Sequence, residues 1–245
     1  MNILLWLAYK GTNYSGFQVQ PNGVTVCAVV QDAMQSVFGT RPDVKGCSRT
    51  DAGVHARRFA LNFHYDGRIP VQRIPLALNA RLPMVPDDFH ARYAAHAKTY
   101  HYRLRCSAVD DPFDYETCHR VNGPLDLAAM QAAAAHFVGR HDFLALCASG
   151  SSAAAHGDTV RTITACTVQQ DGELYTLSVT ADGYLYNMVR ILAGTVLQAG
   201  LGKMNPAAVP ALLQSRNRGQ AGPTLPARGL FLWDVQYPDL ERPND

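Results

Sequence analysis

Residues 160–200, VRTITACTVQQDGELYTLSVTADGYLYNMVRILAGTVLQAG, contain the pattern that decides the fold class. Residues 160–169 and 173–181 are typical of two strands that are joined by a hairpin turn at Asp171–Gly172. The mostly apolar stretch 187–200 comes next and predicts a helix. A hairpin followed by a packed helix indicates a mixed fold with an antiparallel sheet.

The same alternation of strands and helices extends outward along the chain. Further strands are expected at 2–9, 43–47, 59–65, 89–96, 98–106 and 230–237. Further helices are expected at 26–38, 74–82 and 126–138 and after Pro206. The small, polar stretch 147–158 predicts a mobile loop. We therefore predict an α+β fold of two related halves, 1–106 and 107–245, that share a mainly antiparallel sheet.

Composition limits the class of protein. Of 245 residues, 47% are apolar and 17% charged, which is typical of a globular chain. No apolar run approaches the ~18 residues of a membrane helix, and the start, MNILLWLAYKG, reads as a strand rather than a secretory signal. We expect a soluble cytoplasmic protein whose six cysteines are reduced thiols, since none lies at C-x-x-C or zinc spacing.

Charge is unevenly distributed along the chain. Residues 1–110 hold 13 Lys and Arg against 7 Asp and Glu, whereas residues 111–245 hold 9 against 13. The balances of +6 and −4 make the net charge of +2. A basic half suggests a polyanionic partner such as nucleic acid.

The familiar cofactor motifs are missing from the sequence. It contains no G-x-x-x-x-G-K-[ST], no G-x-S-x-G and no G-x-G-x-x-G after the first strand. What remains is a site led by a carboxylate, with no cofactor or metal expected.

The best candidate for that carboxylate is Asp51, in the stretch CSRTDAGVHARRF at 47–59. Basic residues crowd around it in the sequence: Arg49, His55, Arg57 and Arg58. In the simplest interpretation, the Asp51 side chain accepts a hydrogen bond from a neighbouring backbone N–H of the turn. Nearby arginines, however, favour the ionised form that suits a nucleophile or general base, and they can grip phosphate. Gly53 gives a ligand or backbone clearance.

Two distant features could complete such a site. Arg190 lies in an apolar helix, where a buried arginine needs a carboxylate or anion, unless its stem reaches solvent. Gly194, four residues on, would let another segment approach closely. In KTYHYRLR at 98–105, Tyr100 and Tyr102 share a strand face beside basic residues that include Lys98. Such an aromatic is either an ordinary sheet residue or a platform on which an unpaired base stacks.

Together these stretches resemble the pseudouridine synthases, specifically the tRNA pseudouridine synthase A (TruA) family. The resemblance rests on SRTDAGVHA at 48–56, PDDFHARYAAHAKTYHYRL at 86–104, ADGYLYNMVRILAGTVLQAGLGK at 181–203 and LPARGLFLWDVQYP at 225–238. YKGTNYSGFQVQ at 9–20 matches more loosely.

This resemblance implies ferredoxin-like halves around a central basic cleft, a homodimer, and conversion of uridine to pseudouridine at positions 38, 39 and 40 of the tRNA anticodon stem-loop, without cofactor or metal. It makes Asp51 the catalytic aspartate, Tyr100 the tyrosine that stacks on the target base, and Arg190 the partner of Asp51. Arg49 becomes a basic residue of the catalytic loop. Candidate contacts to the RNA backbone are His55, Arg57, Arg58 and Lys98.

The chain also departs from the family pattern. Lys10, Phe17 and Ser48 stand where the family usually has Asp, Trp and Gly, and no arginine follows HDFLALCASGSS until Arg161. The missing arginine affects the RNA contacts expected of the loop at 147–158, not the chemistry. Three alternatives stay open: a non-catalytic RNA-binding protein on the same fold, a synthase acting at another RNA site, and a carboxylate-based nucleoside hydrolase.

Overall fold

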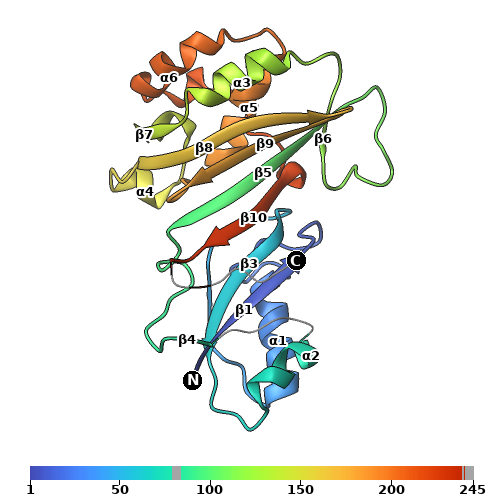
Figure 1. The fold of residues 1–245 in the computed structure, drawn as a ribbon, viewed down its shortest axis with the longest axis vertical. Coiled ribbons are helices and arrows are strands. Elements are labelled where there is room, and N and C mark those ends of the chain that lie inside the picture. The colour runs from blue at the N-terminus through green and yellow to red at the C-terminus, as the bar shows by residue number, and fades with distance from the viewer. Residues whose placement is uncertain (79–83, 239, 241–245) are drawn as a thin grey trace. The chain divides into compact units, whose positions relative to one another are not determined.

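The computed structural model describes residues 1–78, 84–238 and 240 (Figure 1). The chain forms two compact units. Unit 1 comprises Met1–His96 with Leu232–Asp245, and unit 2 comprises Ala97–Phe231. These bounds differ from those of the predicted halves, 1–106 and 107–245. The structural similarity of the two halves stays a prediction. Among the described residues, no helix has the length and apolar composition needed to cross a bilayer.

Unit 1 is built on the long antiparallel pairing of β1 with β3, in which Leu5 lies opposite Leu61. Its strands are β1 (Asn2–Tyr9), β2 (Val44–Gly46), β3 (His55–His64), β4 (Met84–Val85) and residues 232–236 of β10 (Leu230–Gln236). The order is β4-β1-β3-β10, with β2 also pairing with β3. Its helices are α1 (Val26–Phe38), η1 (Val71–Arg73) and α2 (Ile74–Leu78).

Helix α1 covers the predicted range 26–38, and it begins after Thr25, whose hydroxyl accepts a hydrogen bond from the Ala28 N–H at 3.3 Å. Its buried positions are Val26, Cys27 and Met34, whereas Val29 and Ala33 are exposed. For the second predicted helix, 74–82, the structure describes α2, and residues 79–82 lie outside the described part of the chain.

The strand predicted at 89–96 is wrong, because this segment forms turns. The Asn2 side-chain amide donates to the carbonyls of Pro86, Asp87 and Phe89. The Asn62 carbonyl oxygen accepts the Ala91 N–H at 2.8 Å. Buried asparagine side chains thus take backbone groups that a neighbouring strand would otherwise pair.

Unit 2 contains residues 160–200, whose pattern indicated the fold class. Its strands are β5 (Ala97–Cys106), β6 (His119–Val121), β7 (Gly139–Asp142), β8 (Val160–Asp171) and β9 (Leu174–Ala181). The order is β5-β9-β8-β7, all antiparallel, while β6 runs parallel to β5. The predicted hairpin is confirmed, with its turn one residue later than predicted, at Gly172–Glu173: Asp171 lies opposite Leu174, and Gly172 has the positive φ, +56°, that this tight turn requires. The predicted mixed fold with a mainly antiparallel sheet is therefore confirmed.

The helices of unit 2 cover its sheet on one side. They are α3 (Leu127–Ala135), η2 (Leu144–Leu146), α4 (Ser152–Ala155), α5 (Met188–Gly200), η3 (Pro206–Ala208), α6 (Val209–Ser215), η4 (Arg218–Gln220) and η5 (Ala227–Gly229). Helix α3 packs on β8 and α5, and α5 packs on β5 (Figure 1). Alternate residues of β9 are buried, as expected of a sheet with one covered face. The stretch 147–158, predicted as a loop, contains α4.

The six cysteines, all within the described residues, are thiols. Five are buried and Cys106 is half-buried. Burial raises the pKa of Cys118 to about 11 and that of Cys166 to about 12. These two thiols therefore remain protonated and unreactive near neutral pH.

Candidate active site

Asp51 lies in unit 1, in the loop between β2 and β3 (residues 47–54, the Asp51 loop). The loop turns back at this residue, because the Val54 N–H donates to the Asp51 carbonyl at 3.2 Å. Gly53 sits within the turn at φ +77°, a conformation that favours glycine. Asp51 is half-buried. The turn thus explains the Asp-Ala-Gly sequence. Its hydrogen bond uses the backbone carbonyl of Asp51 and not the side-chain carboxylate.

A second segment, residues 9–17 (the N-terminal loop), holds the Asp51 loop on both sides of Asp51. On one side, the Phe17 N–H donates to the Thr50 carbonyl at 3.1 Å, and the hydroxyls of Tyr9 and Thr50 are 2.9 Å apart. On the other side, the Gly53 N–H donates to the Tyr14 carbonyl at 3.2 Å. Neither Tyr9 nor Thr50 is among the site residues predicted from sequence.

Two glycines explain why these loops can lie so close. A Cβ atom on Gly11 would lie 2.0 Å from the Val54 carbonyl oxygen. A Cβ atom on Gly16, which also has φ +86°, would lie 2.6 Å from the Thr50 carbonyl oxygen. Backbone therefore packs on backbone, and only glycine fits. The glycines of YKGTNYSG were the one sequence signal that could have indicated this contact.

The basic residues around Asp51 have different environments. Arg49 and Arg57 are exposed. His55 is 1% exposed, and its Nδ1 accepts the Gly11 N–H at 3.0 Å. A guanidinium nitrogen of Arg58 lies 3.6 Å from a carboxylate oxygen of Asp234. The basic residues around Asp51 thus fall into two groups: exposed cations, and side chains that support the structure of unit 1.

Tyr100 lies on β5 in unit 2, opposite Val179 of β9, and is buried. Its ring meets the ring of Tyr184 edge-on, with centroids 4.9 Å apart. The Tyr184 hydroxyl lies within hydrogen-bond distance of the Lys98 and Val179 carbonyls, at 2.7 and 2.8 Å. Burial raises the pKa of Tyr184 well above its ordinary value, so this hydroxyl stays a donor. Tyr184 thereby braces the Tyr100 ring against the paired strands.

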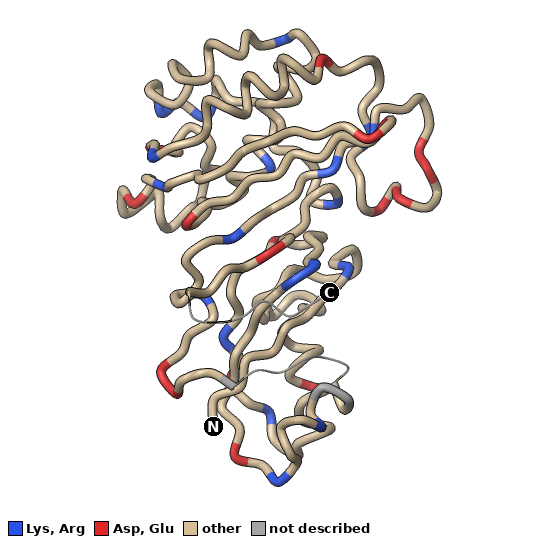
Figure 2. Tube along the Cα trace, in the orientation of Figure 1, with Lys and Arg blue, Asp and Glu red and all other residues tan. Residues whose placement is uncertain are grey.

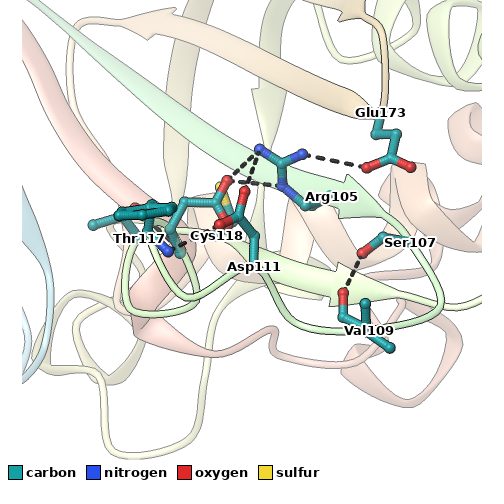
Figure 3. A network of polar contacts seen from close by, with 9 residues as sticks. Arg105, Ser107, Val109, Asp111, Thr117, Cys118 and Glu173 are labelled. Carbon is teal, nitrogen blue, oxygen red and sulfur yellow. Dashed lines mark hydrogen bonds and ion pairs between the residues drawn. The ribbon is translucent and has the colours of Figure 1, made fainter.

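The other charged residues of β5 are engaged in different ways. Lys98 is buried, whereas the Arg103 guanidinium lies 5.7 Å from the centre of the Phe231 ring. Arg105 donates from Nε to Asp114 at 2.8 Å and from Nη1 to Glu173 at 3.3 Å (Figure 3). The Asp114 contact anchors residues 107–118, an excursion between β5 and β6 whose acidic residues are red in Figure 2. Arg105 therefore organises a loop of its own unit.

Arg190 is the third residue of α5 and is half-buried. Its Nε donates to the Leu225 carbonyl at 2.6 Å, and Nη1 donates to Asn187 Oδ1 at 2.8 Å. Tyr102, beside it, donates its hydroxyl to the Pro226 carbonyl at 2.7 Å. Burial raises the pKa of Tyr102, and the charge of Arg190 opposes that rise.

The close approach predicted at Gly194 is confirmed. A Cβ atom there would lie 1.9 Å from the Pro223 carbonyl oxygen. The Gly222 N–H also donates to the Thr195 hydroxyl at 3.0 Å. Residues 222–226, the segment that approaches, bring their backbone directly onto α5, which places the Leu225 carbonyl beside Arg190.

The site residues predicted from sequence are thus described in two sets. Asp51, with the residues that hold its loop, belongs to unit 1, and Tyr100 and Arg190 belong to unit 2. The pairing of Asp51 with Arg190 stays a prediction. Within residues 1–78, 84–238 and 240, no three His, Cys, Asp or Glu side chains are grouped as they would be around a metal ion.

Comparison with known proteins gives a consistent result. The sequence profile of the tRNA pseudouridine synthase family matches residues 6–105 and 133–238. A tRNA pseudouridine synthase A from Moorella thermoacetica is 44% identical over 242 residues, which cover 94% of this chain and 97% of the relative. One from Caldicellulosiruptor saccharolyticus is 40% identical over 245 residues, which cover 96% and 99%. This chain belongs to the tRNA pseudouridine synthase family.

Proposed function

We propose that this protein is a tRNA pseudouridine synthase that converts uridine to pseudouridine at positions 38, 39 and 40, in the anticodon stem-loop. The observation that carries the proposal is similarity over nearly the whole chain to proteins named tRNA pseudouridine synthase A. The intact motif SRTDAGVHA supports it, with Asp51 in a loop held by backbone contacts on both sides.

The proposed reaction is an isomerisation. The bond from the sugar C1′ to uracil N1 breaks, the uracil turns while it is held, and a bond from C1′ to C5 forms. C5 loses a proton and N1 gains one, so the atoms balance without a co-reactant. The uridine must leave its helix first, which costs a few kcal/mol that phosphate contacts and base stacking can offset. Asp51 is the proposed reacting carboxylate.

Three other residues have proposed roles in this reaction. Tyr100 stacks on the extruded base, and its bracing by Tyr184 supports that role because a fixed ring makes a better platform. Arg190 pairs with Asp51 and keeps its carboxylate ionised. Arg49, which is exposed, contacts the RNA or orients the loop.

The environments of the remaining candidates support two kinds of role. Arg57 is exposed and suits a phosphate contact. His55 and Arg58 suit support of the Asp51 loop and of β3, given the Gly11 and Asp234 contacts. Lys98 remains a proposed RNA contact, although it is buried in unit 2.

We also propose the larger features that the family resemblance implies. These are two related, ferredoxin-like halves, a central basic cleft for the anticodon stem-loop, a homodimer, and action in the cytoplasm without cofactor or metal. The basic balance of residues 1–110 supports the cleft, because RNA binding needs cations near phosphates.

The test is to incubate the purified protein with an unmodified tRNA transcript and to map pseudouridine at each nucleotide. We expect it at positions 38 to 40, and no product when these uridines are replaced by cytidine. Pseudouridine at other positions would favour a synthase with another RNA site. Tight tRNA binding without any product would favour a non-catalytic RNA-binding protein, and release of free uracil would favour a hydrolase.

A further inference from the structure

The residue before α5 has an unusual backbone conformation. Asn187 has φ +57° and ψ +11°, in the left-handed region. Among the described residues only one other that is not glycine, Arg216, has a positive φ, of +53°. Asparagine tolerates this region better than most residues, yet glycine tolerates it best. An asparagine kept in this conformation suggests that its side chain is needed.

The side chain of Asn187 does not perform its usual task at this position. Asparagine at the start of a helix normally accepts a hydrogen bond from a backbone N–H of the first turn, which stabilises the helix. Asn187 makes no such side-chain cap, although its backbone carbonyl accepts the Ile191 N–H at 3.0 Å. Its Oδ1 instead accepts Nη1 of Arg190 at 2.8 Å. The side chain thus serves the arginine rather than the helix.

A second contact fixes the same guanidinium. The Leu225 carbonyl accepts Arg190 Nε at 2.6 Å, and the Leu225 N–H donates back to the Arg190 carbonyl at 3.3 Å. Leu225 precedes Pro226, which biases its backbone towards an extended conformation. Direct packing of Pro223 on Gly194 keeps this segment in place.

These two contacts engage two of the three guanidinium nitrogens. Nε has a single hydrogen, which Leu225 takes, and one hydrogen of Nη1 goes to Asn187. Two anchors on one planar group set both its position and its tilt.

We propose that Asn187 is a positioning residue for the reaction: together with Leu225, it fixes the position and tilt of the Arg190 guanidinium. This inference rests on the proposed function, in which Arg190 pairs with the reacting carboxylate of Asp51. Arg190 is the group that acts, and Asn187 acts through it. The left-handed backbone of Asn187 brings its amide to the guanidinium.

The test is the Asn187→Gly variant, which keeps the backbone conformation and removes the amide. We expect kcat for pseudouridine formation to fall about tenfold or more, because small misplacements of an orienting group are costly. The KM for tRNA and the melting temperature should stay near wild type, since glycine relieves the left-handed strain. The matched control is Arg216→Gly, at the other left-handed residue, which should keep full activity.

A double-mutant cycle separates positioning through Arg190 from other effects. In an Arg190→Leu background, Asn187→Gly should cause no further loss of kcat, because the group through which it acts is gone. Additive losses would overturn the inference, as would full activity of Asn187→Gly alone. Wild-type protein that forms no pseudouridine in tRNA would overturn the proposed function and this inference with it. Active wild type with an unaffected Asn187→Gly variant would overturn the inference alone.

Discussion

At the scale of single residues, the two units hold their key side chains by different means. The loop of Asp51 is fixed through backbone groups, with Thr50 and Gly53 bonded to the N-terminal loop. Arg190 is fixed through its own guanidinium, by Leu225 and Asn187. A reacting side chain must be held in position by contacts that do not use its reacting atoms. Hydrogen bonds to the backbone of the loop do this for a carboxylate.

Replacing Asp51 with asparagine should abolish pseudouridine formation. The amide is close in shape to the carboxylate but is a far weaker base and nucleophile. Binding of tRNA should stay within about threefold of wild type, because phosphate contacts supply most of the affinity. Product is measured by nucleotide mapping, and binding by filter retention. Turnover of Asp51→Asn at the wild-type rate would remove Asp51 from the chemistry.

His101 should make stability depend on pH. Burial, and to a lesser degree the charge of Arg103, lowers the pKa of His101 to about 4. In the unfolded chain that pKa is near ~6.5, so between these values only the unfolded state binds the proton. Stability should therefore be complete above about pH 6.5 and should fall as the pH is lowered towards about 4, by about 1–2 kcal/mol for a partly exposed ring.

Urea unfolding across this pH range measures the effect of His101. The His101→Gln variant should show a smaller pH dependence than wild type. Some dependence should remain, because burial and the charges of Arg228 and Arg120 also lower the pKa of His119. An identical pH dependence in wild type and His101→Gln would contradict the prediction.

At the scale of elements, close backbone packing determines where loops lie. The N-terminal loop meets the Asp51 loop at Gly11 and Gly16, and residues 222–226 meet α5 at Gly194. In each case the absent Cβ atom lets carbonyl and N–H groups approach and pair. These contacts tie the candidate residues Asp51 and Arg190 to regular elements, β3 in unit 1 and α5 in unit 2.

Tyr9→Phe should loosen the Asp51 loop. It removes the hydroxyl that lies 2.9 Å from the Thr50 hydroxyl, in a largely buried setting. We expect a loss of about 1 kcal/mol in the free energy of unfolding and a several-fold lower kcat. Tyr14→Phe is the control for stability, because Tyr14 contributes its backbone carbonyl to the contact and phenylalanine retains it. Equal stability of Tyr9→Phe and wild type would show that this hydroxyl contact is dispensable.

Gly194→Ala should displace residues 222–226. The new methyl group would lie 1.9 Å from the Pro223 carbonyl oxygen, a backbone atom that cannot turn away. We expect a loss of about 3 kcal/mol in stability, together with lower activity, because the Leu225 carbonyl would leave Arg190. The control is Gly200→Ala in the same helix, where the nearest atoms belong to the flexible side chain of Met130. Thermal unfolding of both variants should rank Gly194→Ala well below Gly200→Ala.

At the scale of the whole molecule, the proposed function depends on electrostatic attraction to RNA. The net charge of +2 is small, so attraction must come from local groups of exposed cations rather than from the total. Several arginines are engaged by carboxylates, among them Arg58 and Arg105. Exposed cations such as Arg57 remain the best candidates for contacts with phosphate.

Binding of tRNA should weaken steeply with salt, because each neutralised phosphate releases counterions. The slope of log K against log salt concentration should fall in magnitude by about 1 in Arg57→Gln. The control is Arg58→Gln on the same strand, which should keep the wild-type slope because Arg58 faces Asp234. Fluorescence titrations at several salt concentrations measure this, and a flat salt dependence of the wild-type protein would contradict binding led by phosphates.

The parts of the protein that sequence reasoning predicted well are those written in local patterns. The hairpin of β8 and β9 and helix α5 need only a few neighbouring residues to be recognised. The prediction of a strand at 89–96 failed because the Phe89 carbonyl and the Ala91 N–H bond the side chains of Asn2 and Asn62, which no local pattern reveals.

Local patterns alone predicted the mixed fold, the family and the candidate residues Asp51, Tyr100 and Arg190, because periodicity and motifs are properties of adjacent residues. The way in which some of these residues are held became visible only in three dimensions. Gly11 meets His55 across 44 residues, and Leu225 meets Arg190 across 35. Such contacts depend on the path of the backbone in space, and a one-dimensional pattern does not contain that path.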